Sequence, residues 1–213
     1  MYIAIVSFFQ KGGPFMYPIL LVLAFGIAIA IERYIYLSYS RKTNRKHLAT
    51  LMPLLQQGNF KQAYEITSKS NSTVNQILAQ GLSRYKGATN RDDIETAMEE
   101  SMMEAIPRLE KRTHYLAMFA NIATLLGLLG TIIGLIRAFT AVAQVDPSMK
   151  AEILSTSISV AMNTTAFGLM VAIPLILIYT VLQTKTTEII DSLEMTTVKF
   201  GNLIMQRKNG SSA

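Results

Sequence analysis

The sequence predicts an all-α membrane protein with three transmembrane helices and long cytoplasmic helical extensions. Half of the 213 residues are hydrophobic and only 16% are charged, whereas soluble domains usually carry about 25% charged residues. Three apolar runs cover residues 16–37, 116–139 and 153–182, and each reaches the roughly 20 residues that a bilayer-spanning helix needs. In a soluble fold these runs would be buried helices, but the chain offers little amphipathic sequence to cover them.

Composition also excludes several classes of site. The chain has no cysteine, which excludes disulfides and thiolate metal sites, and its two histidines are too few for a histidine-rich metal site. The net charge of +6 would suit nucleic acid, but the basic residues flank apolar runs instead of massing on a soluble domain. We therefore expect membrane lipid as a partner, no nucleic acid, no metal and no cofactor.

The distribution of lysine and arginine predicts the topology. Twelve of them lie between the first two apolar runs and four follow the third run, whereas only Lys11 precedes the first. The positive-inside rule places the intervening segment and the C-terminus in the cytoplasm and the N-terminus on the outer side, which is the periplasm if the membrane is a bacterial inner membrane. The expected organisation is a periplasmic segment (1–15), transmembrane helix 1 (16–37), a cytoplasmic helical domain (38–113), transmembrane helix 2 (114–139), a periplasmic link (140–154), transmembrane helix 3 (155–182), and a cytoplasmic C-terminal helix and tail (183–213).

The cytoplasmic segment should be helical. Residues 89–93 offer capping residues and early acids, and Ile94, Ala97 and Met98 then begin an apolar face at helical spacing. No terminator separates this helix from the second apolar run, so we expect one long helix to continue into the membrane. The tail after the third run repeats the helical spacing.

Small and hydroxyl residues form stripes along the second and third runs. Their members are Gly127, Thr131, Gly134 and Ala138 in the second run, and Ser157, Ala161, Thr165, Gly168 and Ala172 in the third. Such stripes can simply let helices approach closely in lipid, and Gly130 and Gly134 form a GxxxG pattern. Pro174 adds an expected kink to the third helix. Because the first run lacks such a stripe, we expect helices two and three to face a shared interior and helix one to face lipid.

The three spans carry no ionisable residue in their middle parts. Glu32, Arg33 and Arg137 lie near the ends of spans. Ionisable groups inside a membrane usually mark ion pathways. If the protein conducts protons, the titrating carboxylate must therefore come from another subunit.

Two stretches resemble a known family. Residues 125–136 (LLGLLGTIIGLI) are similar to the second-helix signature of the MotA/TolQ/ExbB proton channel family, and residues 163–174 (NTTAFGLMVAIP) to its third-helix signature. The resemblance implies a ring of five subunits around single-span helices of an ExbD/TolR-like partner with a membrane aspartate. It implies pore-facing roles for Thr131 and Thr165, and the neighbouring positions expected along the pore are Thr164, Gly127, Gly134, Ser157, Ala161 and Gly168. Many relatives carry a glutamate where this chain has Val160, which leaves the carboxylate to the partner.

The function implied by the resemblance is coupling of proton entry to movement of the partner. Through a TonB-like protein this movement would energise transport across the outer membrane. Residues 28–33 look more like ExbB than TolQ, and three helices argue against MotA. The alternatives are a TolQ-like subunit for envelope integrity and a non-conducting membrane scaffold. We expect no enzyme, since no paired carboxylates, nucleophile–base motif or phosphate loop occurs. Proton versus sodium, the cargo and the stoichiometry stay open.

Overall fold

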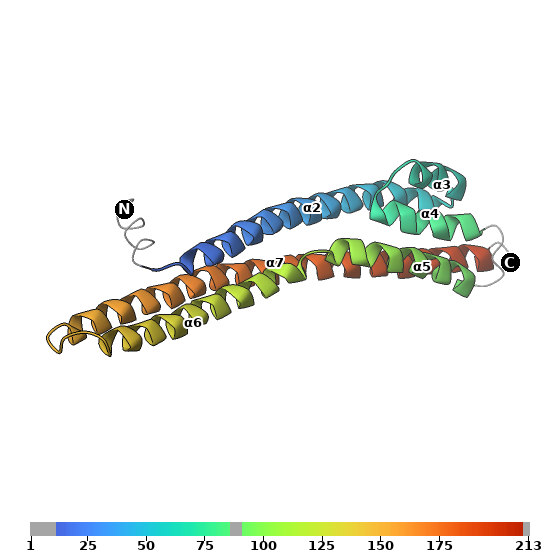
Figure 1. The fold of residues 1–213 in the computed structure, drawn as a ribbon. Coiled ribbons are helices and arrows are strands. Elements are labelled where there is room, and N and C mark those ends of the chain that lie inside the picture. The colour runs from blue at the N-terminus through green and yellow to red at the C-terminus, as the bar shows by residue number, and fades with distance from the viewer. Residues whose placement is uncertain (1–11, 86–90, 211–213) are drawn as a thin grey trace. The chain divides into compact units, whose positions relative to one another are not determined.

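The computed structural model describes residues 12–85 and 91–210, and this part of the chain is built from α-helices (Figure 1). The helices are α2 (Met16–Gln57), α3 (Phe60–Ser68), α4 (Thr73–Tyr85), α5 (Arg91–Glu110), α6 (His114–Val142) and α7 (Lys150–Gly210). Three helical stretches are long and apolar enough to cross a membrane, within Met16–Gln57, Arg91–Val142 and Lys150–Ile204. The predicted all-α membrane class is confirmed. Most of the predicted N-terminal segment 1–15, residues 86–90 and the last three residues lie outside the described residues.

The chain divides into two compact units, and α2 and α7 each contribute to both. The first unit contains the chain up to Glu32 together with Arg112–Val181, and the second contains Arg33–Lys111 together with the chain from Leu182 onward. The first unit therefore holds most of the apolar sequence, whereas the second holds the predicted cytoplasmic helices.

The outer surface of the first unit is apolar. Large side chains that would be buried in a soluble protein are 59–63% exposed here, namely Leu21, Phe25, Leu125, Ile136 and Leu177. An apolar surface of this extent requires a partner or a lipid environment. Figure 1 shows α6 antiparallel to the first part of α7, which follows it after the short link.

The second unit has a conventional hydrophobic core. Amphipathic helices α3, α4 and α5 pack with the later parts of α2 and α7, and the largest fully buried side chains there are Leu37, Leu51, Leu55, Ile77, Leu78, Met98, Leu109 and Phe200. Gly81 makes room for this core, since a Cβ atom at that position would lie 2.6 Å from the Met98 sulfur and 2.9 Å from the Phe200 ring.

The expected continuous helix between cytoplasm and second span is wrong. The helix ends at Glu110 and restarts at His114, and Arg112 between them has a φ of 65°. A non-glycine residue in this left-handed region ends an α-helix. The buried Arg33 guanidinium donates a hydrogen bond to the Leu109 carbonyl, one of the acceptors that the broken helix leaves without an intrahelical donor.

The helical tail after the third span is confirmed. Helix α7 runs unbroken from Lys150 to Gly210, and Pro174 lies inside it at an exposed position. The span and the predicted tail are therefore parts of one helix. Proline removes one backbone donor, and a membrane helix tolerates that loss when neighbouring groups satisfy the freed carbonyl.

Candidate functional site

Helices α6 and α7 bring their backbones close together at two glycines. A Cβ atom on Gly127 would lie 3.2 Å from the Thr165 Cα and 3.4 Å from the Gly168 Cα. A Cβ atom on Gly168 would lie only 2.7 Å from the Ala123 carbonyl oxygen. Since backbone atoms cannot rotate out of the way as side chains can, a side chain at Gly168 would force the helices apart, and one at Gly127 would require the backbone to move by a few tenths of an ångström. We call this contact the α6–α7 seam.

The seam continues toward the far ends of both helices. A Cβ atom on Gly134 would lie 2.9 Å from the Ala161 Cβ, and one on Gly130 would lie 2.5 Å from the Thr164 Cγ2. The structure thus brings both glycines of the GxxxG pattern against small residues of α7. The predicted small-residue stripes meet here, within one chain.

Thr165 forms a hydrogen bond across the seam. Its Oγ1 donates to the Gly127 carbonyl at 2.8 Å, and the side chain is half-buried. A hydrogen bond between helices in an apolar setting stabilises their contact modestly, by about 0.6 kcal/mol on average. Thr165 therefore has a structural partner in addition to its predicted pore-facing role.

Thr164 has a different environment although it is the next residue. It is 2% exposed, and its Oγ1 lies 2.6 Å from the Gly12 carbonyl and 3.0 Å from the Val160 carbonyl. The Gly12 carbonyl belongs to the short segment before α2. Thr164 thus ties α7 to this segment and is enclosed within the chain.

The segment before α2 covers one side of the α6–α7 pair. Gly130 lies against Phe15, since a Cβ atom there would be 3.4 Å from the Phe15 Cβ, and Thr164 bonds Gly12. One residue step turns about 100° around an α-helix. Because α6 and α7 are antiparallel, the step from Gly130 to Thr131 and the step from Thr164 to Thr165 both turn toward the opposite side, away from residues 12–15. We call this the uncovered side, with reference to the described residues.

The hydroxyl protons on this uncovered side are already donated. Thr131 Oγ1 donates to the Leu128 carbonyl at 2.6 Å, as Thr165 does to Gly127. Thr124 Oγ1 donates to the Ala120 carbonyl at 3.1 Å. A hydroxyl has one proton and two lone pairs, so each oxygen still offers an acceptor to a further donor.

The remaining predicted site residues lie in or near the seam. Gly127, Ala161 and Gly168 are buried within the chain, and their pore-lining role stays a prediction. Ser157 is half-buried and lines a cavity of about 150 Å³ together with Arg137, near residues 12–15. Sequence reasoning missed the Gly12 carbonyl as the Thr164 acceptor, and the Gly12–Gly13 pair was the only signal for it.

The charged residues lie at the ends of the spans. Glu32 accepts from the Arg112 guanidinium at 3.3 Å, and Arg137 is exposed near the end of α6. Across residues 12–85 and 91–210, the acidic, histidine and cysteine side chains form no group of three suited to a metal ion. The uncovered side of the seam thus offers hydroxyl acceptors among apolar side chains and no charge of its own.

Comparisons with known proteins agree with these features. A model described as the MotA/TolQ/ExbB proton channel family matches residues 69–195. The putative biopolymer transport protein ExbB homolog of Methanothermobacter thermautotrophicus is 28% identical over 193 residues, which is 90% of this chain and 67% of that protein. The biopolymer transport protein exbB1 of Vibrio cholerae is 28% identical, covering 78% and 73% of the two chains. The Tol-Pal system protein TolQ of Haemophilus influenzae is 32% identical, covering 44% and 40%.

Proposed function

Because the chain belongs to the MotA/TolQ/ExbB proton channel family, we propose that it forms the channel wall of an ExbB-like complex driven by the proton-motive force. Proteins of this family are subunits of membrane complexes in which ExbB or TolQ acts with an ExbD- or TolR-like partner. The observation that carries the proposal is the pair of Thr131 and Thr165 hydroxyls on the uncovered side of the α6–α7 seam.

In the proposed assembly, five copies form a ring whose interior is the uncovered side of the seam. The second and third spans carry no Asp, Glu, Lys, Arg or His between residues 115 and 136 or between 153 and 184, so they supply no carboxylate or amine to carry the proton. A single-span ExbD/TolR-like partner with a membrane aspartate would supply it. The outer, apolar side chains of the first unit would then face lipid or a neighbouring copy.

The hydroxyl geometry indicates which form of the partner carboxyl the wall would bind. Thr131 and Thr165 use their protons on backbone carbonyls, so toward the interior their oxygens act as acceptors. An acceptor pairs with a protonated carboxyl or with water, and it does not pair with a carboxylate. We therefore assign the two threonines the role of stabilising the neutral aspartate while it lies inside an apolar ring, where a charge would be costly.

Within this proposal the other predicted residues support the wall. Gly127, Gly134, Ala161 and Gly168 hold α6 against α7, and Thr164 ties the pair to residues 12–15. Displacing any of them would move the two hydroxyls. Ser157 of α7 lines the same cavity as Arg137 of α6, toward the proposed periplasmic end.

The proposed topology follows the lysine and arginine counts. The N-terminus would be periplasmic, and the second unit and the C-terminus cytoplasmic, in the inner membrane. Proton entry would move the partner and, through a TonB-like protein, energise transport across the outer membrane. The similarity to TolQ keeps a role in envelope integrity as the second candidate.

Assembly with a carboxylate-bearing partner tests this proposal. The chain would be purified in mild detergent with the single-span protein encoded beside it, and the native mass of the complex measured. A ring of this chain holding fewer partner copies is expected. Retention of no such partner across several detergents would contradict the proposal and favour the non-conducting scaffold.

A further inference from the structure

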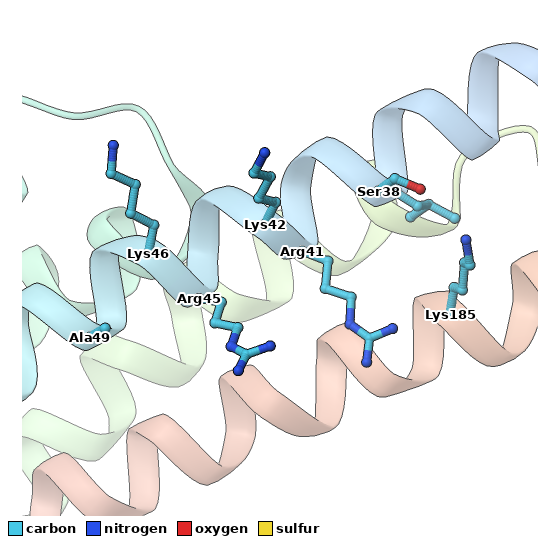
Figure 2. Close-up of a pocket in the computed structure, with 8 residues that line it drawn as sticks. Ser38, Arg41, Lys42, Arg45, Lys46, Ala49 and Lys185 are labelled. Carbon is cyan, nitrogen blue, oxygen red and sulfur yellow. The ribbon is translucent and has the colours of Figure 1, made fainter.

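The second unit carries a basic groove between α2 and α7 that has no role in the proposed channel. The groove has a volume of about 520 Å³, within the range of roughly 300–1,000 Å³ in which proteins hold small ligands. Its lining residues are Leu37, Ser38, Arg41, Lys42, Arg45, Lys46, Ala49 and Lys185. Figure 2 shows Arg41 and Arg45 pointing from α2 toward α7, whereas Lys42 and Lys46 point away from α7.

The positive charge of this basic groove is largely uncompensated. Of the five cations that line it, Arg41 pairs with the Glu188 carboxylate of α7 at 2.9 Å. Within the described part of the chain, Arg45 has no carboxylate within 4.0 Å. Lys185 lies over the Tyr34 ring, 3.8 Å from its centroid, which positions the ammonium without neutralising it. A groove with this excess of positive charge favours an anion.

The position of the groove along the helices indicates where that anion comes from. The apolar part of α2, residues 16–37, would extend about 33 Å, close to the roughly 30 Å thickness of a bilayer's hydrocarbon core. Arg41 follows Leu37 by four residues, or about 6 Å along the helix, which reaches the polar headgroup layer. Lys185 similarly follows the end of the third apolar run. Exposed Tyr34 and Tyr36 mark the same interface, where aromatic side chains are enriched.

We propose that the basic groove binds the phosphate of an anionic phospholipid headgroup from the surrounding leaflet. Arg41 and Arg45 present planar guanidinium groups that match phosphate oxygens in pairs, and Lys185 adds a point charge from the other helix. Lys42 and Lys46 widen the positive field around the groove. The lipid would thereby join α2 to α7 where both leave the membrane, and this role is independent of proton conduction.

The test measures lipid binding to the full-length chain in mild detergent by native mass spectrometry. The probes are dioleoylphosphatidylglycerol and, as the neutral counterpart, dioleoylphosphatidylcholine. The test variant is Arg45→Gln with Lys185→Gln. The matched control is Lys61→Gln with Lys69→Gln, which removes the same charge from exposed positions outside the groove.

Phosphatidylglycerol should bind the wild type at least about tenfold more tightly than phosphatidylcholine. Each cation near an anionic headgroup contributes on the order of fivefold in affinity, so the groove variant, which lacks two cations, should lose roughly twenty-fivefold and the control should lose little. Glu188→Gln should instead strengthen binding, because it releases Arg41 from its ion pair. A misfolded variant would not bind the lipid more tightly. The gain expected for Glu188→Gln therefore distinguishes an effect on the groove from misfolding.

Three results would overturn the proposal. Equal binding of the two lipids would show that the groove does not recognise an anionic headgroup. An acidic protein segment would then be the better candidate for its ligand. Equal losses in the groove variant and the control would reveal a general surface-charge effect. Displacement of phosphatidylglycerol by millimolar inorganic phosphate, with phosphate itself retained, would identify a free phosphate as the occupant.

Discussion

Gly168→Ala should destabilise the first unit because the new methyl group has no room. Its Cβ atom would lie 2.7 Å from the Ala123 carbonyl oxygen and 3.1 Å from the Gly127 Cα, and both are backbone atoms. The two helices must therefore separate. Inserting an extra methylene-sized group into a tight contact typically costs about 1–3 kcal/mol. The accompanying gain in helix propensity, at most about 1 kcal/mol, offsets only part of this loss.

Gly26→Ala is the matched control. A Cβ atom there would also come within 2.7 Å of a neighbour, but that neighbour is the Leu175 Cδ2, at the end of a flexible side chain. The end of a side chain can shift where a backbone atom cannot, although Leu175 is buried, so Gly26→Ala should lose less unfolding free energy than Gly168→Ala. Both variants replace glycine by alanine inside a span, so their intrinsic helix propensities change equally.

The assay is the free energy of unfolding in mixed micelles, followed by circular dichroism. Gly168→Ala should unfold at a lower denaturant fraction than Gly26→Ala. Since Thr165 lies one turn before Gly168 and bonds Gly127, proton flux should fall in the same variant. Equal stability of the two variants would refute the close backbone contact and, with it, the argument that the seam positions the hydroxyls.

Three further predictions concern single side chains. Thr165→Val removes the hydrogen bond to the Gly127 carbonyl and should lower the free energy of unfolding by about 0.6 kcal/mol, and by at most about 1.7. Thr165→Ser keeps a hydroxyl and should unfold with nearly the wild-type free energy. Equal stability of the valine and serine variants would contradict this hydrogen bond. Arg33→Ala should lower the free energy of unfolding by about 1.5–3 kcal/mol, because the Leu109 carbonyl loses a charged hydrogen-bond donor. Amide hydrogen exchange around Arg112 should become faster, and unchanged exchange would refute the capping role of Arg33. Phe200→Ala should lose about 3–5 kcal/mol, whereas the exposed Val198→Ala should change stability little, and similar losses would show that Phe200 is not a core residue.

The membrane spans were predictable from sequence because bilayer thickness imposes a minimum length on an apolar helix. The tail of α7 was predictable for a related reason, since the helical spacing continues past Leu182 without a breaker. The break after Glu110 was not, because Arg112 is neither glycine nor asparagine. The break at Arg112 occurs beside the hydrogen bond from Arg33 to Leu109, and Arg33 is distant in sequence. A local sequence pattern cannot predict such a long-range contact.

The candidate site was predictable as a pair of stripes but not as a set of individual roles. The spacing of Gly127, Thr131 and Gly134 identified one helix face, and the structure places the two glycines of that face against α7 and Thr131 beside them on the uncovered side. Thr164 and Thr165 are adjacent and chemically identical, so sequence could not assign them different surroundings. The Gly12 carbonyl distinguishes them, because it takes the Thr164 proton and covers that side of the helix pair.

The central claim is that the Thr131 and Thr165 hydroxyls line a proton path, and proton flux measures it most directly. The chain and its single-span partner would be reconstituted into liposomes with an internal pH-sensitive dye and energised by a potassium gradient. Thr131→Val should reduce the flux about two- to tenfold, because losing one hydrogen bond to the partner carboxyl costs about 0.5–1.5 kcal/mol. Thr140→Val should not, although Thr140 is on the same helix and likewise donates to a backbone carbonyl, because it points to another face. Equal flux in both variants, with assembly intact, would contradict the account.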